Sequence, residues 1–279
     1  MRKQALRVVA AALGIVLVTA GGAAARSGAA DTIRLSTPMT AAQETPSPTG
    51  SVGDAKGTFT ATVNKTSGGA TLEWRLTFSG LTGPAIAAHI HLAPRGQAAG
   101  VAVPFCAPCT SGASGTANIS EAVLAAIEAG RAYVNVHTRT NTLGEIRGQI
   151  ASVASARTAM TSRQEVPRPK GAVRRARGTF TATARKEGAA ATLTWKLTFS
   201  RLTGRAIAAH IHLGRRGKAG RIAVSLCGPC RSGAGGRATV RGGVLAALET
   251  GRAYVNVHTR RNPGGEIRGQ IAALALSTS

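Results

Sequence analysis

The sequence has very few aromatic and acidic residues. Only 3% of its 279 residues are Phe, Trp or Tyr, and 11 Asp and Glu stand against 35 Lys and Arg, giving a formal net charge of +24 at pH 7. A chain with so few aromatic side chains has little with which to stack bases, whatever its positive charge. Nucleic acid is therefore not the expected partner.

Sequence motifs of common catalytic sites are also missing. The chain has no Gly-x-Ser-x-Gly motif, no glycine-rich loop of the kind that holds phosphates, and no pair of acids at a spacing typical of glycosidases. Hydrolase chemistry is not expected.

The amino terminus has no apolar run of the about 20 residues that a membrane-spanning helix needs. A shorter run, from Val8 to Ala20, follows a basic start and precedes small residues around Ala25 and Ala30. This order is typical of an export signal, cut after one of those two alanines. We expect residues 1–30 to be a signal peptide and the mature chain to have no transmembrane anchor. Its expected location is secreted, periplasmic or in the cell envelope; a retained anchor is the alternative.

Histidine is scarce, and its six copies form two matching sets. The sets are His89, His91 and His137, and His210, His212 and His258, with a constant offset of 121 residues. The same offset extends without a gap over residues 39–150 and 160–271. One domain is therefore duplicated in tandem. We expect domains over residues 31–151 and 152–279, with a short linker around residues 152–158.

The two copies differ greatly in charge. Residues 39–150 contain seven Lys and Arg against six Asp and Glu, a balance of +1, whereas residues 160–271 contain twenty-two against four, a balance of +18. The shared function therefore does not need the basic charge. The second copy either has a separate affinity for anionic surfaces or has drifted in composition.

Each copy reads as a series of short strands. Residues 57–63 and 71–78 alternate polar and apolar side chains around a Gly-Gly turn, and residues 133–138 and 145–150 close the copy. Ser120 is placed to cap a short helix that ends before Gly130. The predicted fold is all-β, with two tandem antiparallel β-sandwich domains that each contain one short helix.

Strand alternation places His89 and His91 on one face and puts Asn135 on the same side as His137. The hairpin between the last two strands should bring Glu145 near His137. Three converging neutral imidazoles suit copper or zinc, with the carboxylate or amide as fourth ligand or orienting group. The second copy offers Glu266 and Asn256 in the same roles. The plain alternative is half-buried histidines bonded within the sheet, with Glu145 and Arg147 as ordinary surface charges.

The four cysteines also lie in register, as Cys106 with Cys109 and Cys227 with Cys230. In an exported chain the default is a local disulfide in each copy. Redox exchange and a zinc knuckle are the alternatives; the first needs a helix N-terminus beside the first thiol, where a Gly-rich segment stands instead.

Taken together, His-Ile-His, the cysteine loop, Ala-Gly-Arg-Ala-Tyr-Val-Asn-Val-His-Thr and Asn-Pro-Gly-Gly-Glu-Ile-Arg-Gly-Gln-Ile resemble the CHRD domain, named after chordin. The resemblance implies an immunoglobulin-like or superoxide-dismutase-like sandwich in an extracellular module. In chordin such domains accompany modules that bind secreted growth factors. Copy one departs at Asn141-Thr-Leu-Gly144, which is expected to loosen its hairpin while keeping Glu145 in register.

The sequence thus predicts an exported, non-enzymatic binding module with a three-histidine copper or zinc site in each repeat. Its expected partner is an unknown extracellular protein or an anionic cell-envelope polymer. Two alternatives stay open. One is a structural or adhesive envelope protein whose basic second domain binds anionic surfaces, and the other is a metal-dependent oxidoreductase of dismutase type.

Overall fold

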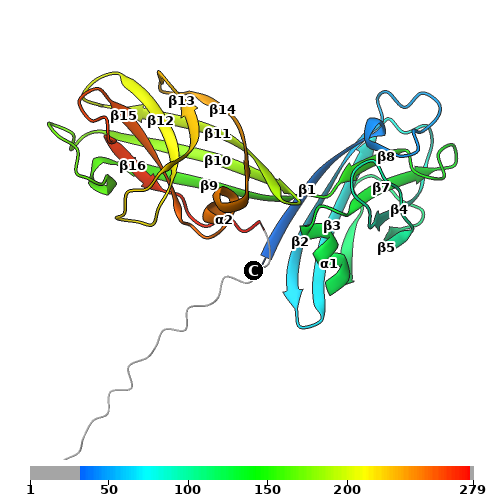
Figure 1. Ribbon diagram of the computed structural model, residues 1–279. Coiled ribbons are helices and arrows are strands. Elements are labelled where there is room, and N and C mark those ends of the chain that lie inside the picture. The colour runs from blue at the N-terminus through cyan, green and yellow to red at the C-terminus, as the bar shows by residue number, and fades with distance from the viewer. Residues whose placement is uncertain (1–31, 277–279) are drawn as a thin grey trace, which may run out of the picture.

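The computed structural model describes residues 32–276, so the predicted signal peptide lies outside the described residues. Within that range the chain is mostly strand (Figure 1). Domain 1 contains β1 (Thr32–Thr40), β2 (Lys56–Thr66), β3 (Gly69–Ser79), β4 (Ala85–His91), β5 (Val101–Cys106), β6 (Ser114–Ser120), α1 (Glu121–Glu128), β7 (Tyr133–Thr138) and β8 (Ile146–Gln149). Domain 2 contains β9 (Ser152–Thr161), β10 (Arg177–Glu187), β11 (Ala190–Ser200), β12 (Ala206–Leu213), β13 (Ile222–Cys227), β14 (Gly235–Arg241), α2 (Gly242–Glu249), β15 (Ala253–Thr259) and β16 (Ile267–Gln270). A short 3-10 helix follows the first strand of each domain, at Ala41–Gln43 and Ser162–Gln164.

Each domain is an antiparallel sandwich, which confirms the predicted fold class. In domain 1 one sheet has the order β6-β3-β2-β1 and the other β5-β4-β7-β8. The strand β1 pairs with β2 along its length and with β8 where Thr40 faces Arg147, so the sheets join along one side. Domain 2 repeats this arrangement with β14-β11-β10-β9 and β13-β12-β15-β16.

The core of domain 1 lies between its sheets because alternate residues of every strand turn inward. Trp74, predicted from its alternating strand to anchor the core, is 7% exposed and packs against Phe105 at 4.6 Å between ring centroids. On the facing sheet the inward residues are Ala88, Ile90, Val134, Val136 and Ile146, all fully buried. This packing leaves the alternate residues of β4, β7 and β8 on the outer face.

The sequence analysis did not predict three of the strands in each domain, namely β1, β5 and β6 and their counterparts β9, β13 and β14. The segment expected to be a linker is part of one of these strands. Residues 152–158 belong to β9, the first strand of domain 2, because the side chains of Ala156, Thr158 and Met160 alternate into its core. Small and polar residues hid that alternation. The strand β6 was missed because most of its side chains are exposed.

The two domains contact each other through their first strands. Arg34 and Leu35 of β1 pair with Val153 and Ser152 of β9. Close by, Arg95 forms an ion pair with Glu187 at 2.9 Å. The domains therefore share a short length of sheet, as Figure 1 shows where β1 meets β9.

The predicted helix is present as α1, and Ser120 caps it by accepting a hydrogen bond from the backbone N–H of Val123. Its counterpart α2 starts after Arg241, which supplies no such side-chain bond. Among residues 32–276, neither helix has the length or the apolar character to cross a bilayer.

Candidate metal centre

The outer face of the sheet β5-β4-β7-β8 is polar and nevertheless buried. Two loops cover it, residues 92–100 and residues 41–49. The side chains on this face are His89, His91, Tyr133, Asn135, His137, Arg147 and Gln149. Apart from His89, which is half-buried, none of them is more than 6% exposed. A polar layer removed from water in this way must satisfy its own hydrogen bonds.

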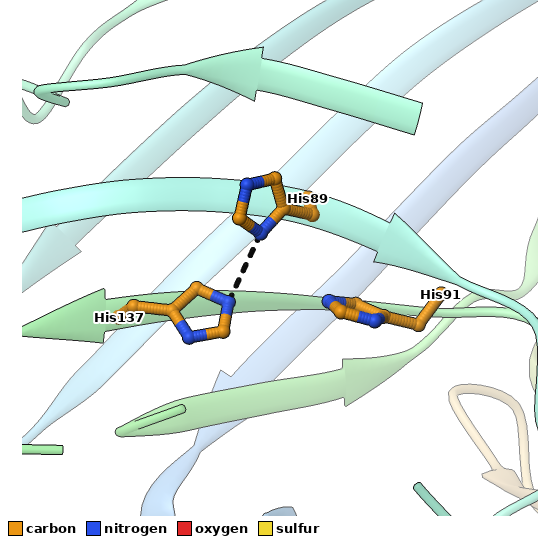
Figure 2. A group of neighbouring side chains, drawn as sticks. All are labelled: His89, His91 and His137. Atoms are coloured by element: carbon orange, nitrogen blue, oxygen red, sulfur yellow. Dashed lines mark hydrogen bonds between the residues drawn. The ribbon is translucent and has the colours of Figure 1, made fainter. Parts of the chain in front are cut away.

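The structure brings the three predicted histidines together (Figure 2). In the antiparallel register His89 faces Asn135, so His137, two residues further along β7, is its diagonal neighbour. Nδ1 of His89 lies 3.1 Å from Nε2 of His137. One ring nitrogen from each of the three histidines lies within 4.8 Å of the other two. Nitrogens that share one ion with bonds of 2.0–2.1 Å are about 3.3 Å apart, so the geometry is close to that of a metal site.

Hydrogen bonds to backbone carbonyls determine which ring nitrogen of His91 and of His137 carries the proton. Nδ1–H of His91 donates to the carbonyl oxygen of Ala99 at 2.8 Å, and Nδ1–H of His137 donates to that of Thr142 at 2.9 Å. Nε2 of each ring therefore carries the lone pair. Nε2 of His91 is buried and has no hydrogen-bond partner among the described residues. An oriented ring with an unmatched lone pair is what a metal-ligating histidine requires.

Burial favours the neutral form of His89 and His137. Burial lowers the pKa of His89 to about 4, and repulsion from protonated His137 and His91 adds to the effect. Burial also lowers the pKa of His137. Repulsion from His91 adds to this effect, whereas the hydrogen bond to Thr142 opposes it. At neutral pH both imidazoles present lone pairs, and protons compete little for them.

Behind the cluster, Tyr133 and Arg147 form a stack that supports His91. The ring of His91 lies parallel to that of Tyr133, at 4.9 Å and 7°. The guanidinium of Arg147 lies 3.4 Å from the centroid of the Tyr133 ring. Arg147 is only 1% exposed and donates to the carbonyls of Gln97 and Pro94. The interpretation of Arg147 as an ordinary surface charge is therefore wrong.

Glu145 does not join the histidines. Its carboxylate accepts hydrogen bonds from Thr82, Thr138 and Asn141. Although burial opposes the shift, these bonds lower its pKa. Glu145 instead holds together the loops beside the site, where Asn141 also bonds to Thr49.

The hairpin of copy one, expected to be loosened by its different loop residues, keeps the same turn as copy two. The backbone N–H of Gly144 donates to the Asn141 carbonyl at 3.1 Å, and Gly265 bonds to Asn262 at the same distance.

Asn135 lies directly across from His89, and its amide nitrogen bonds to groups other than the histidines. Its Nδ2 donates to Glu44 and to the carbonyl of Leu143, both at 3.4 Å. Glu44 is 5% exposed, and burial raises its pKa. The sequence analysis missed Glu44 because it lies 91 residues before Asn135, in a loop whose path cannot be predicted from the strand pattern.

The second copy repeats the centre with different loop residues. Nδ1 of His210 lies 3.1 Å from Nε2 of His258. His212 donates to the carbonyl of Gly220 and His258 to that of Pro263, both at 2.8 Å. Nε2 of His212 is again buried without a partner among residues 32–276. Two further contacts match: Arg268 lies 3.4 Å from the ring centroid of Tyr254, and Glu266 accepts hydrogen bonds from Thr203, Thr259 and Asn262. The pair of Asn256 and Glu165 differs from Asn135 and Glu44, because Oε2 of Glu165 has no hydrogen-bond partner among residues 32–276.

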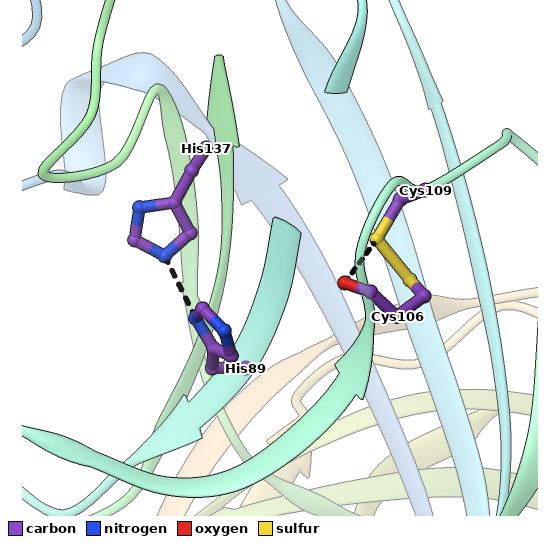
Figure 3. The surroundings of a disulfide bond; sticks show 4 residues. All are labelled: His89, Cys106, Cys109 and His137. Carbon is purple, nitrogen blue, oxygen red and sulfur yellow. Dashed lines mark hydrogen bonds between the residues drawn. A yellow bond between two sulfur atoms is a disulfide. The ribbon is translucent and has the colours of Figure 1, made fainter. Parts of the chain in front are cut away.

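The cysteines form the two local disulfides expected from the sequence, Cys106 with Cys109 and Cys227 with Cys230. Figure 3 shows the first of them at the end of β5, apart from the pair of His89 and His137. A turn and the strand β6 follow Cys109, and β14 follows Cys230 in the same way. The helix N-terminus that activates a thioredoxin-type thiol is therefore not next to either pair in the described chain.

Fold and site together define a duplicated β-sandwich module with a histidine cluster in each copy. A family model for the CHRD domain matches residues 35–150 and 156–271. The chain therefore belongs to the CHRD domain family, with two tandem copies, and this membership supports a binding module rather than an enzyme. Comparisons with curated proteins and with solved structures return no match.

Proposed function

We propose that this protein is a metal-binding module that holds one copper or zinc ion in each domain. In domain 1 the ligands are Nδ1 of His89 and Nε2 of His91 and of His137. In domain 2 they are the corresponding atoms of His210, His212 and His258. The observation that carries the proposal is the buried, unpartnered Nε2 of His91 beside a pair of ring nitrogens 3.1 Å apart, repeated in the second copy.

The chemistry of this donor set suits those two metals. Neutral imidazole is a good ligand for zinc and for copper, and the carbonyl bonds of His91 and His137 raise the basicity of the nitrogens that face the ion. Three protein ligands leave one coordination position open. His91 and His137 are 5% and 6% exposed, whereas His89 is half-buried, so the open position is reached past His89.

Location is part of the same proposal. Both cysteine pairs are disulfide-bonded, which supports a compartment that is oxidising, such as the periplasm, the envelope or the extracellular space. In such a compartment two sites on one chain either store metal or present it to a partner.

Calorimetric titration of the purified chain with Zn²⁺ and with Cu²⁺, in competition with a chelator of micromolar affinity, tests the proposal. We expect two equivalents to bind. His137→Ala should bind one, and the double variant His137→Ala/His258→Ala should bind none. Asp54→Asn, which removes an exposed carboxylate, is the matched control and should keep two. Absence of uptake by the unaltered chain, or two equivalents in the double variant, contradicts the proposal.

The same samples separate binding from catalysis. If the copper-loaded chain consumes superoxide and the double histidine variant does not, the module is an oxidoreductase and the non-enzymatic assignment is wrong. We expect the copper-loaded chain, freed of unbound copper, to consume no more superoxide than the double histidine variant treated in the same way.

A further inference from the structure

Domain 2 contains a hollow whose lining is basic only in this copy. It has a volume of about 580 Å³ and lies where the end of β11 and the start of β12 approach the disulfide loop. Three arginines line it, Arg201, Arg205 and Arg231, together with the apolar side chains of Phe199 and Leu202. No acidic residue contributes to the lining.

The matching positions of domain 1 carry no charge. With the offset of 121 residues, Arg201 corresponds to Gly80, Arg205 to Pro84 and Arg231 to Thr110. The three arginines therefore line one hollow from two separate segments of the chain, the loop of residues 201–205 and the turn after Cys230. Compositional drift alone adds arginines without regard to where they meet.

Arg201 also occupies a backbone conformation that favours glycine. Its φ is 58°, and among residues 32–276 it is the one non-glycine residue with a positive φ. Gly80, its counterpart in domain 1, has a φ of 68°. An arginine held in that region is strained, and such strain persists where the side chain has a use.

The three guanidinium groups are exposed, and no ion pair or side-chain hydrogen bond to another described residue engages them. Planar guanidinium forks match the oxygens of phosphate in a bidentate manner, which makes arginine the residue of choice for binding that group. Phe199 and Leu202 add an apolar surface in the same hollow.

We propose that this hollow binds a phosphate group carried on a small organic body, with Arg201, Arg205 and Arg231 on the phosphate and the carbon skeleton against Phe199 and Leu202. The site belongs to domain 2 alone and is independent of the histidine clusters. A phosphate-bearing polymer that displays such groups would be held through this domain, while domain 1 remains free of it.

The test is calorimetric titration of the full chain with glycerol 3-phosphate and with inorganic phosphate at constant ionic strength, with glycerol as the neutral probe. We expect both phosphates to bind and glycerol not to. The variant Arg201→Gly/Arg205→Pro/Arg231→Thr installs the residues of domain 1 and should weaken phosphate binding at least tenfold. Its fold is protected because glycine relieves the positive φ, and its melting temperature verifies this.

A second variant with the same loss of charge makes the test decisive. Arg237→Ala/Arg241→Ala/Arg260→Ala removes three exposed arginines outside the hollow. We expect it to bind phosphate within twofold of the unaltered chain. Equal weakening in both triple variants would show that the net charge of domain 2 attracts phosphate without a defined site, and would overturn the proposal. No binding of either phosphate by the unaltered chain would also overturn it.

Discussion

The two domains keep the same sandwich and the same buried polar face and differ most in the charge of their surfaces. Their histidine pairs are each 3.1 Å apart and their arginines each lie 3.4 Å from a tyrosine ring centroid, while the balance of charge changes from +1 to +18. The comparison teaches that the centre depends on backbone carbonyls more than on loop side chains. Ala99 and Gly220 serve His91 and His212 equally well, because only the carbonyl oxygen takes part.

The largest structural effect is expected from removing the buried arginine of either domain. Arg147→Met leaves the carbonyls of Gln97 and Pro94 without their donor and removes the group stacked on Tyr133. We expect a loss of about 3 kcal/mol in the free energy of unfolding of domain 1. Arg268→Met should lower the free energy of unfolding of domain 2 by the same amount, although domain 2 carries the higher net charge.

Each domain contains a single tryptophan, Trp74 or Trp195, so fluorescence in a background with the other changed to Phe reports one domain at a time. The exposed Arg139 gives the control, and Arg139→Met should change the unfolding free energy by less than about 0.5 kcal/mol. A loss in only one of the two buried-arginine variants would break the equivalence of the domains.

A smaller effect distinguishes the domains by pH. Burial raises the pKa of Glu165 to about 7, against the opposing Val166 N–H, Arg268 and Asn256. Since the folded carboxyl holds its proton more tightly than the unfolded one, its contribution to stability is full below pH 4.5 and is lost as pH rises through about 7. Domain 2 should lose roughly 2 kcal/mol from this group between pH 5 and 8.

Glu165→Gln should remove that loss, as measured by denaturant unfolding followed through Trp195 at both pH values. Glu44→Gln should change the pH dependence of domain 1 in the same direction but less, because the pKa of Glu44 is raised by a smaller amount. An unchanged pH dependence in Glu165→Gln would show that Glu165 is not the group responsible for the loss. His210 cannot replace it, because its lowered pKa makes domain 2 more stable as pH rises.

The smallest effect concerns the helices. Ser120→Ala removes the side-chain cap of α1 and should destabilise domain 1 by about 1 kcal/mol. Arg241→Ala, at the matching position, should leave domain 2 unchanged within error, since Arg241 caps nothing. Equal losses in the two variants would contradict this difference between the helices.

Strand alternation in the sequence predicted part of the histidine centre but not the residues that loops bury. It correctly gave the sandwich and the shared face of His89, His91 and His137, because a two-residue period and a short hairpin fix both. It failed for Glu145, whose partners Thr82 and Asn141 lie in loops, and for Arg147, whose burial depends on the loop of residues 92–100. Loop paths follow from tertiary packing, so a residue buried by a loop looks exposed in the sequence.

Nitrogen-15 NMR of the histidine rings, before and after two equivalents of Zn²⁺, tests the central claim most directly. We predict that zinc shifts Nδ1 of His89 and His210 and Nε2 of His91, His137, His212 and His258, while the nitrogens bonded to carbonyls keep their protons. Ring nitrogens that do not respond to zinc in either domain would contradict the account.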